Sequence, residues 1–521
     1  MIRSNLFAAA LSMLFSCFYV LSAQEPGFQT RWGDQGDGTY INPVLNADYS
    51  DPDVIRVGKK YYMVASDFHY LGMQVLESDD MVNWKIISQI YDRFDLPLWD
   101  SNMRYAGGSW APSIRYHDKK FWVYFCTPHE GLFMSTASDP HGPWSELHCV
   151  KAVEKWEDPC PLWDDDGQAY LAHSLHGAGP IIIHKMSPDG KQLLDDGVTV
   201  YRGPVAEGPK CHKMNGYYYI SIPEGGVTSG WQTMLRSRNI YGPYESKHVL
   251  ETGTTKVNGP HQGSLVETPK GEWWFYHFQE THPLGRVVHL QPARWEDGWP
   301  VIGADYDGNG VGEPVAVWKK PDIKVRNSSP SVPQTSDDFS GGKKGLQWQW
   351  NHNPHNDHWS LSEREGWMTI RAQKADGLVS AHNMLTQKCT GFVGTATTML
   401  DLKGIEEGQR AGLLAIGNLF YGIGVLRQNG KLYIYVDDKN QATMLQEIDA
   451  DEICLSVTYN APLNTFQFSF GPDKDSLKPY GAPFSLRSGF WKGARIGLYT
   501  YNVLGDGGKA CFDWFDYPVV K

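Results

Sequence analysis

Residues 49–66 show the clearest alternation of polar and apolar positions in the chain. A polar entrance, Ser50-Asp51-Pro52-Asp53, precedes a short apolar run that ends at Val57, and a second run rich in aromatic residues follows Gly58-Lys59. Short alternating runs of β-branched and aromatic residues around a glycine predict two strands joined by a tight turn. We therefore expect a β-hairpin whose first strand begins at Asp51.

The same frame returns four more times along the chain. The four further copies are residues 111–122, 158–170, 207–218 and 262–274. Each copy is followed by a second hairpin, and the turns of two of these hairpins, at 139–144 and 239–244, are alike. Repeats spaced by about 50 residues, each with two hairpins, are typical of the four-stranded blades of a β-propeller. The pattern predicts a five-bladed β-propeller over residues 24–318.

The pattern changes after Trp318. Proline, serine and charged residues dominate 319–336, a composition typical of a linker. From 337 to 521 short strands alternate with turns such as Gln428-Asn429-Gly430-Lys431, which indicates a two-sheet β-sandwich. No row of aromatic residues stands out there, so we favour a sandwich that braces the propeller and lends a loop to a pocket rim over one that binds polysaccharide.

Residues 1–23 have the features of a signal peptide. Arg3 precedes an apolar run from Leu6 to Leu21, and Leu21-Ser22-Ala23 resembles a cleavage site. We expect a secreted or periplasmic protein that starts near Gln24; lipid anchoring at Cys17 is the less favoured alternative, because the apolar run continues past it. No other apolar run is long enough to span a membrane.

Composition narrows the function classes. The 521-residue chain carries a net charge of -12, which argues against a nucleic-acid partner, since phosphate binding needs a basic face. Aromatic residues make up 13%, and they suit either stacking on sugar rings or filling β cores. The cysteines show no paired spacing, so neither a zinc site nor a disulfide framework is indicated.

Three of the five repeats begin with a carboxylate: Asp51, Asp158 and Glu207. Inner strands of a propeller line its central channel, so their first residues converge at one mouth. Carboxylates crowded in this way raise one another's pKa and mark functional sites, whereas each motif alone would be read as a turn cap. Two carboxyls on either side of a glycosidic bond are what glycoside hydrolysis needs, and a third can keep one of them protonated.

These segments resemble glycoside hydrolase family 43, whose members are five-bladed propellers that invert the anomeric centre. Within the family the chain is similar to two-domain β-xylosidases and α-L-arabinofuranosidases with a C-terminal sandwich of the concanavalin-like jelly-roll kind. The resemblance implies three catalytic roles and two further site residues: Asp51 as general base, Asp158 as pKa modulator, Glu207 as general acid, Arg286 in Leu284-Gly285-Arg286 as the active-site arginine, and Trp110 in Gly108-Ser109-Trp110 as a wall aromatic.

Four further positions are less fixed. The family's central histidine corresponds to His261, although counting back from the strand could select Gln262. Phe68 is either part of the sugar pocket or core. We expect Glu157 to face outward and Glu224 to give structural support.

The sequence therefore predicts an all-β, inverting, exo-acting glycoside hydrolase. It would release terminal α-L-arabinofuranose, β-D-xylose or both from plant cell-wall polysaccharide or oligosaccharides, using Arg286, Trp110, Phe68 and His261 to bind the sugar. No metal ligands are predicted and no cofactor is required, but a structural calcium near the channel centre stays open. The alternatives are a non-catalytic carbohydrate-binding propeller and a retaining glycosidase on a related scaffold.

Overall fold

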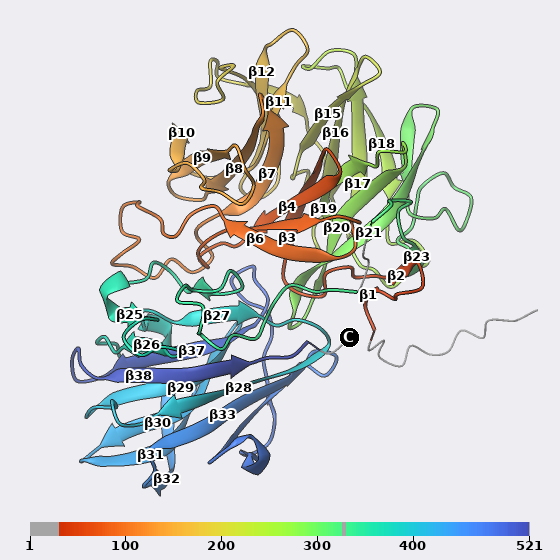
Figure 1. The fold of residues 1–521 in the computed structure, drawn as a ribbon. Helices are drawn as coiled ribbons and strands as arrows, with labels where there is room; N and C mark the ends of the chain where they lie inside the picture. Colours follow the sequence, from red (N-terminus) through yellow and green to blue (C-terminus); the bar gives the residue numbers. More distant parts are fainter. Residues whose placement is uncertain (1–30, 326–329, 520–521) are drawn as a thin grey trace, which may run out of the picture.

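The computed structural model describes residues 31–325 and 330–519 as an almost purely β protein in two parts (Figure 1). Within these residues the helical segments are three short 3-10 turns, η1 (Asn356–His358), η2 (Leu378–Ser380) and η3 (Lys474–Ser476). None of the described helices is long and apolar enough to cross a bilayer. The predicted signal peptide and Cys17 lie outside the described residues. The predicted all-β class is confirmed.

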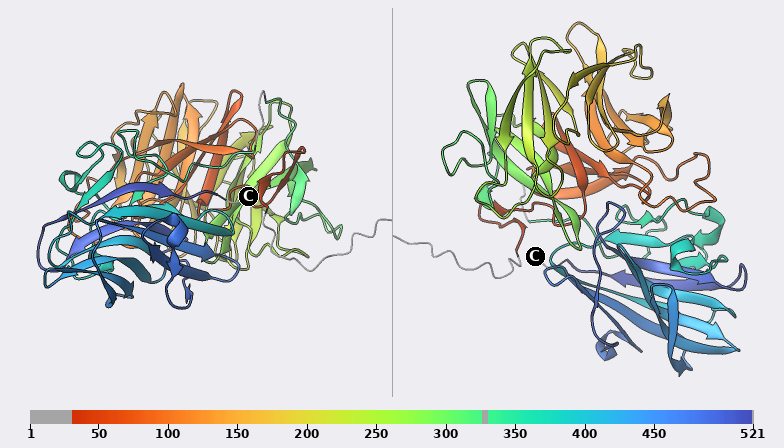
Figure 2. Two further views of the ribbon diagram at one scale, coloured as in Figure 1. Left: turned by 60° about the horizontal axis from the view of Figure 1, so that its bottom comes forward. Right: turned by 180° about the vertical axis from the view of Figure 1, so that it is seen from behind.

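Five four-stranded antiparallel sheets follow one another around a central axis, as the repeats predict (Figures 1 and 2). The blades are β3 (Ser50–Val57), β4 (Lys60–Ser66), β5 (Gln74–Ser78) and β6 (Trp84–Gln89); β7 (Trp110–His117), β8 (Lys120–Thr127), β9 (Gly131–Ala137) and β10 (His148–Ala152); β11 (Trp156–Trp163), β12 (Ala169–Leu175), β13 (Ile181–Met186) and β14 (Val198–Tyr201); β15 (Lys210–Met214), β16 (Tyr217–Glu224), β17 (Trp231–Ser237) and β18 (Glu245–Leu250); β19 (His261–Glu267), β20 (Trp273–Thr281), β21 (Gly285–Glu296) and β22 (Trp299–Ile302).

Apolar side chains seal the ring between neighbouring blades. One cluster joins Tyr62 of blade one to Phe121 of blade two, and similar clusters lie between each later pair. The last cluster contains both Tyr276 of blade five and Met63 of blade one, so the ring is closed. Burial of these faces, at about 25 cal/mol per Å2 of apolar area, is what the alternating pattern of each strand provides.

A small sheet ties the beginning of the propeller segment to its end. It pairs β1 (Gly33–Asp34) with β2 (Thr39–Ile41), and β2 with β23 (Val317–Lys319). Residues 317–319 therefore return to the start of the propeller before the chain continues into the second part.

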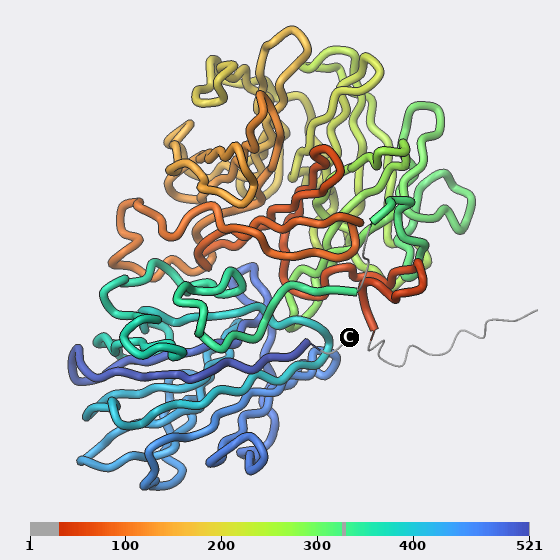
Figure 3. The backbone as a smooth tube through the Cα atoms, in the orientation of Figure 1, coloured from red at the N-terminus to blue at the C-terminus, as the bar shows by residue number. Residues whose placement is uncertain are grey.

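The second part is a sandwich of a seven-stranded and an eight-stranded sheet, which confirms the predicted sandwich (Figure 3). The first sheet contains β24 (Gln349–Trp350), β27 (Leu385–Lys388), β37 (Arg495–Asn502), β29 (Gln409–Ile416), β30 (Phe420–Gln428), β31 (Lys431–Asp438) and β32 (Gln441–Ile448). The second contains β25 (Trp359–Ser360), β26 (Met368–Arg371), β38 (Lys509–Asp516), β28 (Val393–Asp401), β33 (Glu452–Asn460), β34 (Thr465–Gly471), β35 (Lys478–Pro479) and β36 (Phe484–Ser485).

Buried ion pairs hold the sandwich against the propeller. Lys492 Nζ lies 2.7 Å from Asp48 Oδ2, and Lys388 Nζ lies 3.1 Å from Asp67 Oδ1. Leu284 and Val287 of the propeller also join the apolar core of the sandwich. Breaking a buried ion pair is strongly destabilising, so these contacts fix where the sandwich loops stand relative to the channel mouth.

Candidate active site

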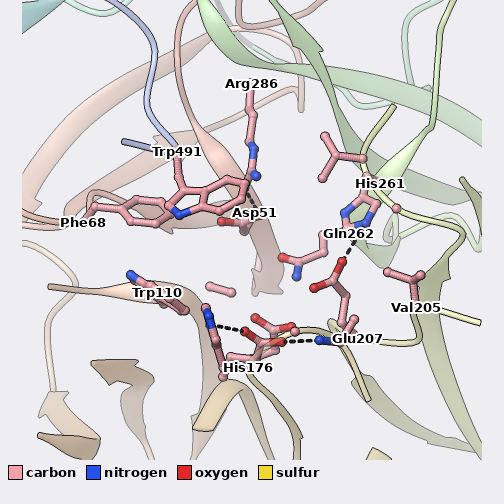
Figure 4. Close-up of a pocket in the computed structure, with 17 residues that line it drawn as sticks. Asp51, Phe68, Trp110, His176, Val205, Glu207, His261, Gln262, Arg286 and Trp491 are labelled. Atoms are coloured by element: carbon pink, nitrogen blue, oxygen red, sulfur yellow. Dashed lines mark hydrogen bonds and ion pairs between the residues drawn. The ribbon is translucent and has the colours of Figure 1, made fainter. Parts of the chain in front are cut away.

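All seven predicted site residues line one cavity of about 410 Å3 at a mouth of the central channel (Figure 4). Every blade contributes a wall residue, and the sandwich contributes Trp491. The full lining is Asp51, Phe68, Trp110, Ala111, Glu157, Asp158, His176, Gly177, Ala178, Val205, Glu207, Gly226, Val227, His261, Gln262, Arg286 and Trp491. Trp491 confirms the prediction that a loop of the sandwich contributes to the pocket rim.

A shared backbone kink sets which residues point into this cavity. One residue at the entrance of each inner strand has a positive φ: Asp51 (55°), Ala111 (33°), Asp158 (60°), Gly208 (60°) and Gln262 (32°). In blades one, two, three and five the strand register shifts at this point, as in a β-bulge. Positive φ is uncommon for residues with a side chain and clusters at functional sites.

This register corrects two readings of the sequence. In blade four the residue with the positive φ, which is the equivalent of Asp51 and Asp158, is Gly208. Glu207 therefore stands one residue before that shared position. Glu157 occupies that same earlier position in blade three. It is 6% exposed and lines the cavity, so the expectation that it faces outward is wrong. The cause is the kink, which turns both positions toward the channel mouth.

Asp51 is buried in an environment that favours its ionised form. Arg286 Nη1 lies 3.0 Å from Oδ1, and the hydroxyls of Ser50 and Ser66 donate to Oδ2 at 2.8 and 2.5 Å. Burial alone would raise the pKa of Asp51, but the charge of Arg286 and the two hydrogen bonds outweigh it and hold that pKa below its usual value. Asp51 can therefore accept a proton from water at neutral pH.

Across the cavity, Glu157, Asp158 and Glu207 form a cluster in which one carboxylate oxygen of each residue lies within 4.8 Å of one oxygen of the other two. Asp158 accepts hydrogen bonds from Gly208 N at 2.7 Å and Ser174 Oγ at 3.1 Å. Burial, followed by the charges of Glu207 and Asp51, nevertheless raises the pKa of Asp158 to about 7. Because these carboxyls disfavour one another's ionisation, the cluster as a whole can hold a proton near neutral pH, which is what a general acid requires.

Glu207 projects from the loop before β15 toward His261, and its Oε1 lies 3.0 Å from His261 Nε2 (Figure 4). Gln262, one residue on, occupies the register of Asp51 and also lines the cavity. The two residues therefore have different places in the pocket. Gln262 stands at the kink, and His261 contacts the acid.

Aromatic side chains form the rest of the wall. The rings of Phe68 and Trp110 lie 5.9 Å apart, and His176 lies 5.1 Å from Trp110 on the side of Glu157. Trp491 is 55% exposed at the rim, 5.9 Å from the Arg286 guanidinium. Its loop comes this close because Gly493 packs on the backbone of Leu284, where a Cβ would lie 2.0 Å from the carbonyl oxygen.

Glu224 lies outside the cavity lining, as expected for structural support. Its carboxylate accepts hydrogen bonds from the side chains of Tyr201, at 3.0 Å, and of Trp231, at 3.3 Å. Sequence reasoning did not name Trp491, His176 or Val205. None of them stands at a position repeated between blades.

A five-bladed propeller with an ionised aspartate facing a protonated carboxyl cluster defines a glycoside hydrolase site. Comparison with known proteins agrees. The profile of "Glycosyl hydrolases family 43" matches residues 40–300, and that of "Beta xylosidase C-terminal Concanavalin A-like domain" matches residues 336–518. The chain belongs to glycosyl hydrolase family 43.

Three similar proteins place the chain within the family. A putative beta-xylosidase of Xylanibacter ruminicola is 58% identical, over 90% of this chain and 88% of its own. The non-reducing end alpha-L-arabinofuranosidase BoGH43B of Bacteroides ovatus is 29% identical over 92% and 94%. The solved structure of a bifunctional GH43-CE protein of Bacteroides eggerthii is 28% identical to this chain, with a TM-score of 0.82. The match covers 92% of this chain and 64% of the Bacteroides eggerthii chain.

Proposed function

We propose that this glycoside hydrolase is exo-acting and inverting, and releases a terminal α-L-arabinofuranose or β-D-xylose from pentose-containing polysaccharide or oligosaccharides. The observation that carries the proposal is the pairing of Asp51 with Arg286 on one side of the pocket, opposite the clustered carboxyls of Glu157, Asp158 and Glu207. The relatives named as a β-xylosidase and an arabinofuranosidase support a pentose.

In the proposed reaction, a water oxygen attacks the anomeric carbon while Asp51 takes one proton from that water. The bond between the anomeric carbon and the glycosidic oxygen breaks, and Glu207 gives its proton to the leaving oxygen. Asp158 keeps negative charge beside Glu207 and so helps it hold the proton until the bond breaks. Arg286, Trp110, Phe68 and His261 bind the sugar that occupies the pocket.

This chemistry needs no cofactor, because two carboxyls supply both proton transfers. A structural calcium near the channel centre stays an open alternative. Three aromatic residues on the walls and rim, Phe68, Trp110 and Trp491, support a pocket that takes one terminal sugar.

A panel of aryl glycosides tests the substrate class. We expect hydrolysis of aryl α-L-arabinofuranoside, aryl β-D-xyloside or both, and none of the aryl galactosides. Asp51→Asn serves as the matched control, since it removes the base and keeps a side chain of the same shape; because it also leaves Arg286 without its ion-pair partner, its thermal midpoint is measured to check that it is folded. Turnover that persists in Asp51→Asn, or a preference for galactosides, would contradict the proposal.

We further propose that residues 1–23 direct export and that the mature chain starts near Gln24. The charged start, apolar run and small-residue cleavage site support this. Mass spectrometry of the protein recovered outside the cytoplasm should give an N-terminus near Gln24. A chain that retains Met1, or a lipid on Cys17, would contradict the proposal.

A further inference from the structure

Glu157 is a fourth carboxyl in the pocket, beyond the three that the proposed reaction uses. It stands one residue before Asp158, in the register that Glu207 occupies in the next blade, and only 6% of it is exposed. Its Oε1 accepts one long hydrogen bond, from Ala178 N at 3.3 Å. Within the described residues it pairs with no lysine or arginine, and the ring nitrogen Nδ1 of His176 lies 3.6 Å from its Oε2.

The carboxyls around Glu157 compete for protons. One carboxylate oxygen each of Asp158, from the same strand, and of Glu207, from blade four, lies within 4.8 Å of an oxygen of Glu157. His176 faces Glu157 from the loop after β12, and Asp51 lies farther away. Three carboxyls this close cannot all be ionised at neutral pH.

The hydrogen bonds that each carboxyl group accepts determine which carboxyl keeps a proton. In the proposed reaction Glu207 holds the proton that it donates, so Asp158 and Glu157 compete for any further proton. Asp158 accepts two hydrogen bonds, which favour its ionised form. Glu157 has only the long contact from Ala178. Burial, then the charges of Asp158 and Glu207, raise the pKa of Glu157, in agreement with this assignment.

The proton on Glu157 is free to be donated to a ligand. At 3.6 Å the contact with His176 Nδ1 is longer than a hydrogen bond. A buried hydroxyl donor without a partner is unfavourable, so a bound hydroxyl group would complete the site.

The position of Glu157 indicates which sugar it contacts. Glu207 protonates the glycosidic oxygen in the proposed reaction, so the leaving sugar lies beside Glu207 and away from Asp51. Glu157 adjoins Glu207, and the half-exposed ring of His176 leads from Glu157 toward the rim, where it lies against Trp110.

We propose that Glu157 is a substrate-binding residue that stays protonated and donates a hydrogen bond to a hydroxyl of the leaving sugar. This inference rests on the proposed function and adds to it a determinant of which linkages are cleaved. Glu157 would then matter for a pentose attached to another sugar, and much less for a pentose attached to an aryl group.

Two variants test the proposal on a matched pair of substrates, an aryl β-D-xyloside or α-L-arabinofuranoside and the oligosaccharide that presents the same terminal pentose. Glu157→Leu should lower kcat/KM for the oligosaccharide about tenfold, through KM, and for the aryl pentoside by less than about threefold. Glu157→Gln should recover most of the oligosaccharide activity, because its amide donates a hydrogen bond without charge. Glu154→Gln, an exposed neighbour in the same segment, is the control and should change neither.

The pH profile gives a readout that a merely structural role would not move. If Glu157 is neutral in the working enzyme, Glu157→Gln leaves the charge of the cluster unchanged and both limbs of the profile stay in place. An alkaline limb displaced to lower pH would show that Glu157 is ionised and would overturn the proposal. Equal losses on both substrates, no loss on either, or a Gln variant as impaired as the Leu variant would overturn it as well.

Failure of this inference is distinguishable from failure of the proposed function. A wild-type protein that cleaves neither pentoside refutes the proposed function and this inference with it. Wild-type activity that Glu157→Leu leaves intact on both substrates refutes this inference alone. The thermal midpoint of each variant checks that it is folded.

Discussion

Replacing Arg286 with methionine should destabilise the propeller strongly at neutral pH, because it leaves Asp51 as an uncompensated buried charge. The two side chains are 8% and 5% exposed, and their ion pair spans 3.0 Å. The Coulomb energy at that distance is about 5.5 kcal/mol at an effective dielectric constant of about 20, and removal of one partner of a buried pair costs about 3–5 kcal/mol. Two hydroxyl hydrogen bonds to Asp51 remain, so we expect a loss toward the lower end of that range.

The loss should shrink as the pH falls. In the wild type the pKa of Asp51 is held below its usual value, so its stabilising contribution is present at neutral pH and is lost on acidification. Without Arg286 burial dominates and the carboxyl takes up a proton more readily, which relieves the penalty at low pH. The difference in unfolding free energy between wild type and Arg286→Met should therefore be smaller at pH 4 than at pH 7.

Urea denaturation of the wild type, Arg286→Met and Arg286→Met/Asp51→Asn at the two pH values provides the assay. The double variant should recover much of the lost stability at pH 7, since no unpaired charge remains. A single variant within about 1 kcal/mol of wild type at pH 7, or a double variant no more stable than the single one, would refute the reasoning.

Other variants test the roles in the reaction. Glu207→Gln should lose about 100-fold or more on sugar leaving groups and far less on activated aryl groups, measured as kcat/KM; equal losses would reject Glu207 as the acid. Asp158→Asn removes a negative charge beside the acid, so the alkaline limb of the pH–rate profile should move to lower pH, and an unmoved or raised limb would count against that role. Trp491→Ala should raise KM about tenfold with little change in thermal midpoint, whereas Leu504→Ala, another exposed apolar side chain of the sandwich, should not.

The fold was predictable because its signals are local. The strands show alternating polar and apolar residues, and the hairpins have turns marked by glycine. Because this pattern occurs five times, it predicts the propeller without any knowledge of tertiary contacts. The convergence of Asp51, Asp158 and Glu207 followed from the same repetition, since the entrances of the inner strands of a ring must meet at its centre.

The errors arose where one residue of register decides the direction of a side chain. An alignment of the repeats on their carboxylates makes Glu207 equivalent to Asp51 and Asp158 and predicts that Glu157 faces outward. The shared prolines Pro52, Pro159 and Pro209 give the register that the structure shows, with Glu157 and Glu207 equivalent. Trp491 carried no such signal, because it reaches the rim through packing between two parts of the chain that no local pattern encodes.

The most direct test of the account is the anomeric form of the first product, followed by proton NMR during hydrolysis of xylo-oligosaccharide or arabinoxylan. A water molecule activated by Asp51 attacks from the face opposite the leaving oxygen, so the account predicts free pentose of inverted configuration from the earliest time points, without oligosaccharides of mixed length. Pentose that appears first with retained configuration, or early release of mixed oligosaccharides, would contradict it.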